Sequence, residues 1–391
     1  MKTLILTLLS LVAIGCNKQS AITTFREDLK LLESVEDLTI LQDGDAMIAA
    51  SGAYQGRIFT STTKGINGRS LGYFNRGLMG KGSSLYNLTK LGGEGRMWFG
   101  PEIGKYAIFF APNTPQNAHT INVSPELDTN LFKPIAKTKH SITYGNRMTI
   151  RNANSYHFIM DAKRKISLKN KTNIEQELNI QLNEHISHVG FSAETWIKNM
   201  NQEQWTKENG LLSVWDISCI LPTPLTTVII PSQSNIDSVS NYFTPLNSTR
   251  VIIKDNIVYY KADAAYMNKI GIQPEYCKNV FGSYSPEINL LTIVKYHFTK
   301  DSLYVNSQWG HEKPYKGDVI NIFNGEVNES LDRAWPFYEL ETSSSAKELQ
   351  PGEEMYHMHS IYHFEGDEGY LDNIANQVLG VSIIKLSEIL K

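Results

Sequence analysis

Hydrophobic and polar residues follow three patterns along this chain. Residues 4–14 form an almost unbroken apolar run. From about residue 38 to residue 365, apolar residues come in short β-rich runs separated by Gly, Asn and Pro, which is typical of antiparallel strands joined by turns. Phe25, Leu29 and Leu32 are spaced by four and three residues, and a similar spacing returns after residue 370. We therefore expect mainly β structure with a short helix near each end.

Thr24 stands where it can cap the N-terminal helix. The clearest strand candidates are five short runs at 46–49, 57–60, 106–110, 251–253 and 290–294. The sequence contains no internal repeat and no low-complexity linker that would divide it into separate domains. We expect residues 16–37 to be a tether and short helix. Residues 38–391 are expected to form one all-β domain, a large antiparallel β-sandwich.

The N-terminal apolar run has the features of a removable export signal. Lys2 supplies a positive charge, and the run is too short to span a bilayer at roughly 1.5 Å per residue. Small residues directly before Cys16 resemble the bacterial lipobox, although Ala13 replaces the Leu which that pattern prefers. We expect residues 1–15 to be a lipoprotein-type signal peptide, and lipidated Cys16 to anchor the protein to a membrane of the bacterial cell envelope. An ordinary secretory signal is the alternative.

The composition agrees with a folded, exported protein. The 391 residues include 37 Lys and Arg against 40 Asp and Glu, and no basic block is present, so nucleic acid is not expected as a partner. The chain is 41% hydrophobic and 20% charged, which is enough apolar surface for a substantial core. Cys219 and Cys277 could form a disulfide in an oxidising compartment. A buried free thiol is the other interpretation, because Cys219 lies in an apolar run.

Two glutamates in the C-terminal third are candidates for acid–base chemistry. Strand alternation over residues 337–344 places Glu339 and Glu341 on one face. A carboxylate on a concave, partly dry face suits proton transfer, because burial raises its pKa toward neutrality. A solvated outer face is the alternative.

The same alternation over residues 355–364 places His357, His359 and His363 on one face. This arrangement could bind zinc or copper, but no cysteine or carboxylate ligands accompany the histidines at a fixed spacing. We expect them to line a pocket and expect no metal ion or cofactor.

Two further polar segments could supply binding residues. Residues 91–102 combine several glycines with Glu94, Arg96 and Trp98, whose side chains can hydrogen-bond sugar hydroxyls and stack on apolar sugar faces. The spacing does not match a phosphate-binding loop. A structural turn with an Arg–Glu pair is the alternative. Residues 310–324, which include Asp318, are interpreted as a long loop that could carry binding residues.

These segments, in this order, resemble the galactose mutarotase-like (aldose 1-epimerase) superfamily. Leu340-Glu341-Thr342 is similar to the strand motif that carries the family's catalytic base, and the segment 349–353 (Leu-Gln-Pro-Gly-Glu) and the histidine strand follow as in the family. Gly92-Gly93 before Trp98 is similar to its early Gly-Gly region. The chain also resembles a branch of exported bacterial proteins of unknown function.

The resemblance implies a β-supersandwich that binds carbohydrate on the concave face of one sheet. It implies that Glu341 is the catalytic base and that seven residues bind substrate, namely Glu94, Arg96, Trp98, Asp318, Glu339, His357 and His359.

The chain departs from this family at its histidines. Leu91 stands where the family has a His before the Gly-Gly pair, and the strand around Trp215 lacks the catalytic His. Interconversion of anomers needs an acid as well as a base. Four histidines are candidates for that acid, at positions 185, 188, 357 and 359. Two functions follow: an envelope enzyme that interconverts sugar anomers or epimers, or a carbohydrate-binding or structural protein that has lost the chemistry.

Overall fold

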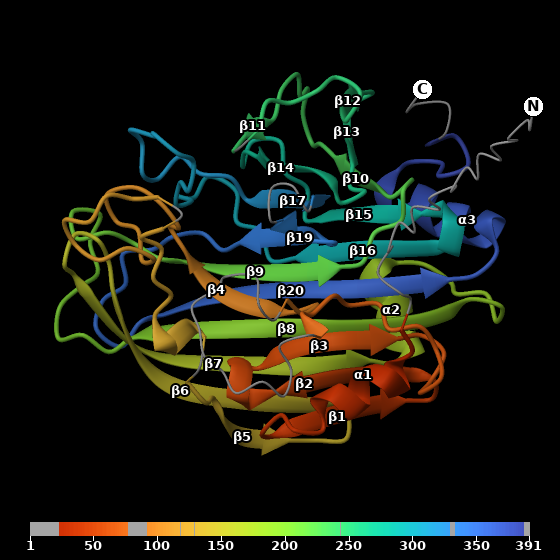
Figure 1. Ribbon diagram of the computed structural model, residues 1–391, viewed down its shortest axis with the longest axis horizontal. Helices are drawn as coiled ribbons and strands as arrows, with labels where there is room; N and C mark the ends of the chain where they lie inside the picture. Colours follow the sequence, from red (N-terminus) through yellow and green to blue (C-terminus); the bar gives the residue numbers. More distant parts are fainter. Residues whose placement is uncertain are drawn as a thin grey trace, which may run out of the picture.

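The computed structural model describes residues 23–76, 92–117, 119–128, 130–242, 244–328 and 333–386. Antiparallel β-sheet dominates this part of the chain, and short helices lie near both of its ends (Figure 1). The expected all-β antiparallel sandwich is confirmed. The strands of the described residues form three sheets, of ten, seven and three strands.

The ten-stranded sheet forms one complete layer. Its strand order is β12-β13-β10-β15-β16-β20-β8-β7-β6-β5. In chain order its strands are β5 (Lys133–Lys137), β6 (Ser141–Arg151), β7 (His157–Lys169), β8 (Ser187–Asn199), β10 (Thr227–Pro231), β12 (Val251–Lys254), β13 (Ile257–Lys261), β15 (Val280–Ser285), β16 (Leu290–Tyr296) and β20 (Glu354–Glu365).

The seven-stranded sheet forms most of the second layer. Its order is β11-β14-β17-β19-β9-β4, and β18 pairs with β17. Its strands are β4 (Arg96–Gly100), β9 (Ser213–Ile220), β11 (Ser240–Asn241), β14 (Ala265–Ile272), β17 (Ile320–Asn328), β18 (Arg333–Ala334) and β19 (Tyr338–Ser343). The three-stranded sheet, β1 (Leu38–Asp43), β2 (Ala46–Ser51) and β3 (Arg57–Thr62), contacts β7 and β8 and continues this layer beside β4.

The main hydrophobic core lies between the two large sheets. Alternate residues of each strand point into it, among them Ile322 and Leu340 from the seven-stranded sheet and Ile166 and Ile361 from the ten-stranded sheet. These side chains are fully buried. The opposite face of the seven-stranded sheet carries the alternate side chains, among them Ile217 and Phe323, which are also buried, and the candidate site lies on that face.

Three α-helices cover parts of the sheets. Helix α1 (Phe25–Leu32) begins at Thr24, whose side chain forms a capping box with Glu27, as the sequence predicted. Helix α3 (Glu368–Leu379) ends at Gly380, which has a φ of 72°. It packs with α2 (Lys171–Leu178) in a second core cluster on the ten-stranded sheet. Helix α2 was not expected, since Ile174 and Leu178 are its only buried residues.

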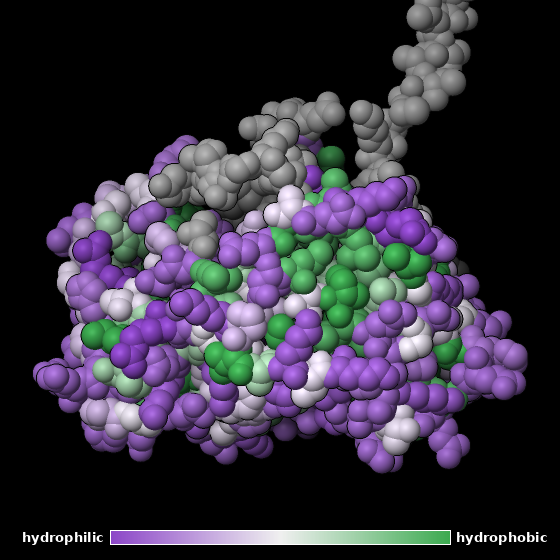
Figure 2. Space-filling view, turned by 90° about the horizontal axis from the view of Figure 1, so that it is seen from below, coloured by the Kyte–Doolittle hydropathy of each residue, from purple (hydrophilic) through white to green (hydrophobic). Residues whose placement is uncertain are grey.

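Two sequence expectations about local structure were wrong. Residues 106–110 are buried but form no strand, because their backbone groups bond to scattered partners and not to a neighbouring strand: Ala107 N donates to Gly104 O, and Ile108 N to Pro101 O, both at 3.1 Å. The expected loop at 310–324 ends earlier than predicted, since β17 begins at Ile320. Figure 2, which views the molecule from below, shows a mostly hydrophilic surface with a larger hydrophobic area right of centre and smaller hydrophobic spots elsewhere.

Candidate functional site

Both glutamates of β19 lie on the face of the seven-stranded sheet that points away from the ten-stranded sheet. Strand register places Glu341 beside Ile217 of β9 and Asn321 of β17, and it places Glu339 beside Cys219. We call this surface the Glu341 face. Alternation along each paired strand decides which other side chains share it.

The carboxylate of Glu341 is buried and half satisfied. Its Oε2 atom accepts hydrogen bonds from Lys269 Nζ and from Trp215 Nε1, both at 2.8 Å. Its Oε1 atom has no hydrogen-bond partner among the described residues. Burial raises the pKa of Glu341 to about 7, although the positive charge of Lys269 opposes this shift. The group can therefore take up or release a proton near neutral pH.

Lys269 of β14 is the cation that faces Glu341. Its Nζ atom lies 4.5 Å from the centre of a Trp215 ring and 5.5 Å from the ring of Tyr242. Burial lowers the pKa of Lys269, but the negative charges of Glu341 and Glu102 outweigh burial, so the pKa is raised overall. Lys269 therefore remains protonated at neutral pH.

Arg96 and Trp98 of β4 lie on the same face as the two glutamates. Arg96 Nη2 is 3.1 Å from Glu339 Oε1, and the Arg96 guanidinium stacks 4.1 Å from the centre of the Trp98 ring. Trp98 also contacts Trp215 at a centroid distance of 5.7 Å. Because Trp98 Nε1 donates to the carbonyl of Leu127, its indole N–H is already occupied.

Asp318 extends this face toward β11. Its carboxylate accepts hydrogen bonds from Tyr242 Oη at 2.7 Å and from Ser240 Oγ at 2.9 Å. It lies over Gly271 of β14, where a Cβ atom would be 2.1 Å from Asp318 Oδ2. Burial raises the pKa of Asp318 to about 6. Because a Cβ atom at position 271 would clash with the carboxylate, the position of Asp318 requires glycine there.

His357 and His359 do not line the Glu341 face, which corrects the sequence expectation. Their side of β20 points into the sandwich, where Thr342 Oγ1 lies 2.9 Å from His357 Nε2 and 2.8 Å from His359 Nδ1. Thr342 follows Glu341 in β19, so its side chain lies on the opposite face. Burial lowers the pKa of each imidazole to about 3, and both rings are neutral at physiological pH.

Glu94 also lies away from the Glu341 face. Its carboxylate is fully buried, and its Oε1 atom is 3.2 Å from Nε2 of His363 on the inner side of β20. The expectation that Glu94 binds substrate together with Arg96 and Trp98 is therefore not met by its position. Residues two positions apart share a face only within a strand, and Glu94 lies in a bend before β4 begins at Arg96, so the alternation of β4 does not extend to it.

Cys219 and Cys277 are free, buried thiols, and Cys219 Sγ is 3.1 Å from Glu339 Oε1. Cys16 lies outside the described residues. No cluster of three or more His, Cys, Asp or Glu side chains within the described ranges is arranged to hold a metal ion. Among the helices of the same ranges, none has the length and apolar character needed to cross a membrane.

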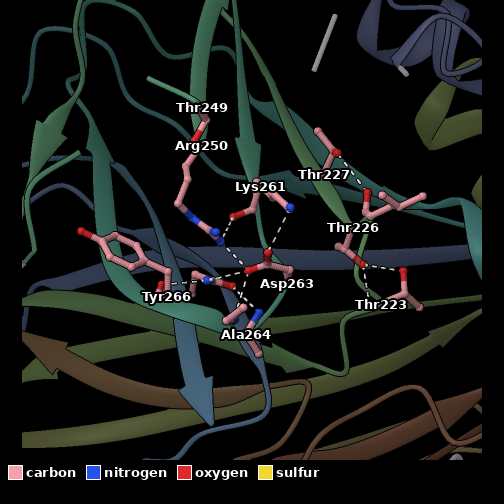
Figure 3. Close-up of polar contacts among 12 residues, drawn as sticks. Thr223, Thr226, Thr227, Thr249, Arg250, Lys261, Asp263, Ala264 and Tyr266 are labelled. Atoms are coloured by element: carbon pink, nitrogen blue, oxygen red, sulfur yellow. Dashed lines mark hydrogen bonds and ion pairs between the residues drawn. The ribbon is translucent and has the colours of Figure 1, made fainter. Parts of the chain in front are cut away.

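A separate cavity of about 500 Å³ lies near the C-terminal end of the described chain. Its lining includes apolar side chains and two cations, among them Leu225, Ile384, Arg250 and Lys261. Figure 3 shows that Arg250 and Lys261 both point to Asp263, and Lys261 Nζ lies 3.4 Å from it. The two cations thus have a carboxylate partner within the protein, and no ligand class is indicated.

The protein is an antiparallel β-sandwich that carries a buried carboxylate–lysine pair, Glu341 and Lys269, on one sheet. The chain belongs to a protein family of unknown function, DUF6786, whose family model matches residues 23–390. No curated protein matches the sequence.

Solved structures that are similar to this fold include two from lactobacilli. A galactose mutarotase-like protein from Lactobacillus casei has a TM-score of 0.49 and 10% identity, over 83% of this chain and 99% of that chain. A galactose mutarotase related enzyme from Lactobacillus acidophilus has a TM-score of 0.46 and 9% identity, over 83% and 97% of the respective chains. The resemblance expected from the sequence is thus found among its structural neighbours.

No sequence pattern marks Lys269 or Tyr242 as a site residue, and Trp215 stands out only as part of a predicted strand. All three contact each other or Glu341, yet they are far apart along the chain. Lys269 has no distinctive neighbours in the sequence. Its alternation with Ile270 and Ile272 in β14 indicates only that the Lys269 side chain points away from the core, and no local signal marks it as a partner of Glu341.

Proposed function

We propose that the Glu341 face binds carbohydrate and that Glu341 is the general base in the interconversion of sugar anomers or epimers. The observation that carries this proposal is the buried Oε1 atom, which has no hydrogen-bond partner among the described residues, of a carboxylate whose pKa is about 7. Such an atom can accept the proton of a sugar hydroxyl, because a base with a pKa near the working pH transfers protons effectively.

The surrounding side chains fit a polar ligand with apolar faces. Trp215 offers an aromatic surface beside Glu341, and Glu339, Arg96 and Asp318 offer hydrogen-bonding groups on the same side of the sheet. Sugar recognition uses this combination of aromatic stacking and hydrogen bonds. These contacts support carbohydrate as the ligand class.

Binding without catalysis is the second candidate. The observation in its favour is the inward position of His357 and His359, which removes two of the expected acids from the vicinity of Glu341. Under this alternative the same face would hold sugar but would not change it.

Exchange spectroscopy on a panel of aldoses separates the two candidates. If Glu341 is the base, Glu341→Gln keeps the shape but removes the base, and exchange should fall by about 10²–10⁴-fold. Affinity for sugar should change little. The control is Glu354→Gln, which changes an exposed glutamate of β20. Acceleration that survives in Glu341→Gln would exclude Glu341 as the base, and no acceleration by the wild-type protein would favour binding alone.

We further propose that the protein is exported and anchored through a lipid on Cys16 in the bacterial cell envelope. The support is the sequence of residues 1–16, with its single early cation and its apolar run that stops at Gly15-Cys16. Mass spectrometry of the mature N-terminus tests this proposal. A first residue other than Cys16, or an unmodified Cys16, would contradict it.

A further inference from the structure

We infer that Lys269 is the proton donor that complements Glu341, so that the two side chains form an acid–base pair on the Glu341 face. This inference rests on the proposed function and names the acid which that function lacks. The geometry that supports it is direct contact: Lys269 Nζ is 2.8 Å from Glu341 Oε2, while the other oxygen of Glu341 has no hydrogen-bond partner in the described part of the chain.

The positions of the two groups fit the chemistry of ring opening. The two oxygens that exchange protons in this reaction, the anomeric hydroxyl and the ring oxygen, are attached to the same carbon. The acid and the base must therefore be neighbours. Lys269 Nζ has three N–H bonds, and the described residues provide one hydrogen-bond partner for them, the Glu341 carboxylate. N–H bonds of Lys269 and the unpaired oxygen of Glu341 thus remain for one sugar.

The step is balanced within the pair and the sugar. Glu341 Oε1 takes the proton of the anomeric hydroxyl, the carbon–oxygen double bond of the aldehyde forms, and the bond between the anomeric carbon and the ring oxygen breaks. The ring oxygen receives a proton from Lys269 Nζ. After rotation of the aldehyde group, the reverse transfers return both protons and close the ring as the other anomer.

The charges of the pair link the two transfers. Burial is the largest influence on the pKa of Lys269 and lowers it, while the negative charge of Glu341 is the largest opposing influence. When Glu341 accepts the sugar proton, this negative charge disappears. Burial is then opposed less, and Lys269 becomes a stronger acid at the moment when a proton is needed.

Other candidate proton donors are less suitable. The Arg96 guanidinium is paired with Glu339. His357 and His359 lie on the inner face. Glu102 is half-buried, and its negative charge raises the pKa of Lys269. The variant Glu102→Gln is therefore tested in parallel.

The test compares Lys269→Arg, Lys269→Ala and wild type by exchange spectroscopy on an aldose that the wild-type protein converts. Arginine keeps the charge but holds its proton, so kcat should fall by about 10²–10⁴-fold. Sugar affinity, measured by tryptophan fluorescence, should change much less. For Lys269→Ala, added methylammonium should restore exchange, and tetramethylammonium, which has the charge but no N–H bond, should not.

Chemical unfolding of each variant shows whether a lost activity reflects a lost fold, and rescue of Lys269→Ala by methylammonium keeps the test valid if Lys269→Arg is unfolded. Wild-type exchange in Lys269→Arg, equal rescue by both ammonium ions, or a loss confined to Glu102→Gln would overturn the role of Lys269. In each of these cases, loss of exchange in Glu341→Gln would leave the proposed function intact. If the wild-type protein accelerates no exchange, the proposed catalysis itself fails.

Discussion

Thr342→Val tests whether the buried histidines are structural. Thr342 Oγ1 lies between His357 Nε2 and His359 Nδ1 at 2.9 and 2.8 Å, and all three side chains are almost completely buried. Valine has nearly the same shape but no hydroxyl group. The substitution therefore removes both hydrogen bonds without opening a large cavity.

The magnitude follows from the number of groups left without a partner. Each polar group that loses its partner in a protein interior costs about 1–3 kcal/mol. Two imidazole nitrogens lose theirs, so the free energy of unfolding should fall by about 2–6 kcal/mol. This is a large share of a typical total of about 5–15 kcal/mol. Thr342→Ser keeps the hydroxyl and removes one methyl group, and it should cost only about 1 kcal/mol.

Guanidinium unfolding followed by tryptophan fluorescence measures the difference between these variants. The midpoint should decrease much more for Thr342→Val than for Thr342→Ser, with similar slopes. If the valine variant is as stable as the serine variant, the hydroxyl does not hold the two imidazoles. That result would refute the interpretation of His357 and His359 as interior structural groups.

Three other predictions concern the interior ion pair, pH and the packing of Asp318. Arg164 Nη2 is 2.7 Å from Asp216 Oδ1 in the core, so Arg164→Met should lower stability by about 3–5 kcal/mol, and adding Asp216→Leu should restore part of the loss in thermal unfolding. Because the ionised form of Glu341 is the base and its pKa is about 7, the exchange rate should rise as pH increases through 7, and a flat profile from pH 5 to pH 9 would contradict this assignment. Gly271→Ala should weaken sugar binding in a titration, because the new methyl group must displace Asp318, and unchanged affinity would place Asp318 outside the binding surface.

Local features with a local cause could be predicted from the sequence. Thr24 and the spacing of Phe25 and Leu32 specify the first helix, and strand alternation correctly placed Glu339 and Glu341 on one face. These signals depend on neighbours within a few residues. The short β-rich runs likewise predicted an antiparallel β fold.

Features that depend on long-range pairing could not be predicted in this way. Lys269 meets Glu341 across 72 residues because β14, β17 and β19 are adjacent strands. Alternation along β20 grouped His357 with His359, but it does not state which face of the strand is internal. The run at 106–110 shows that hydrophobicity predicts burial, whereas strand formation also needs a partner for the backbone.

The short strand β5 protects one edge of the ten-stranded sheet from aggregation. An edge strand offers unpaired backbone groups to other molecules, and a sheet of this size presents a broad template for intermolecular pairing. All five residues of β5 are exposed, lysines stand at both of its ends, and Pro134 lacks a backbone N–H, while the register with β6 shifts between Pro134 and Ala136. Removal of this proline and these charges would therefore convert a protected edge strand into a site where two molecules can pair.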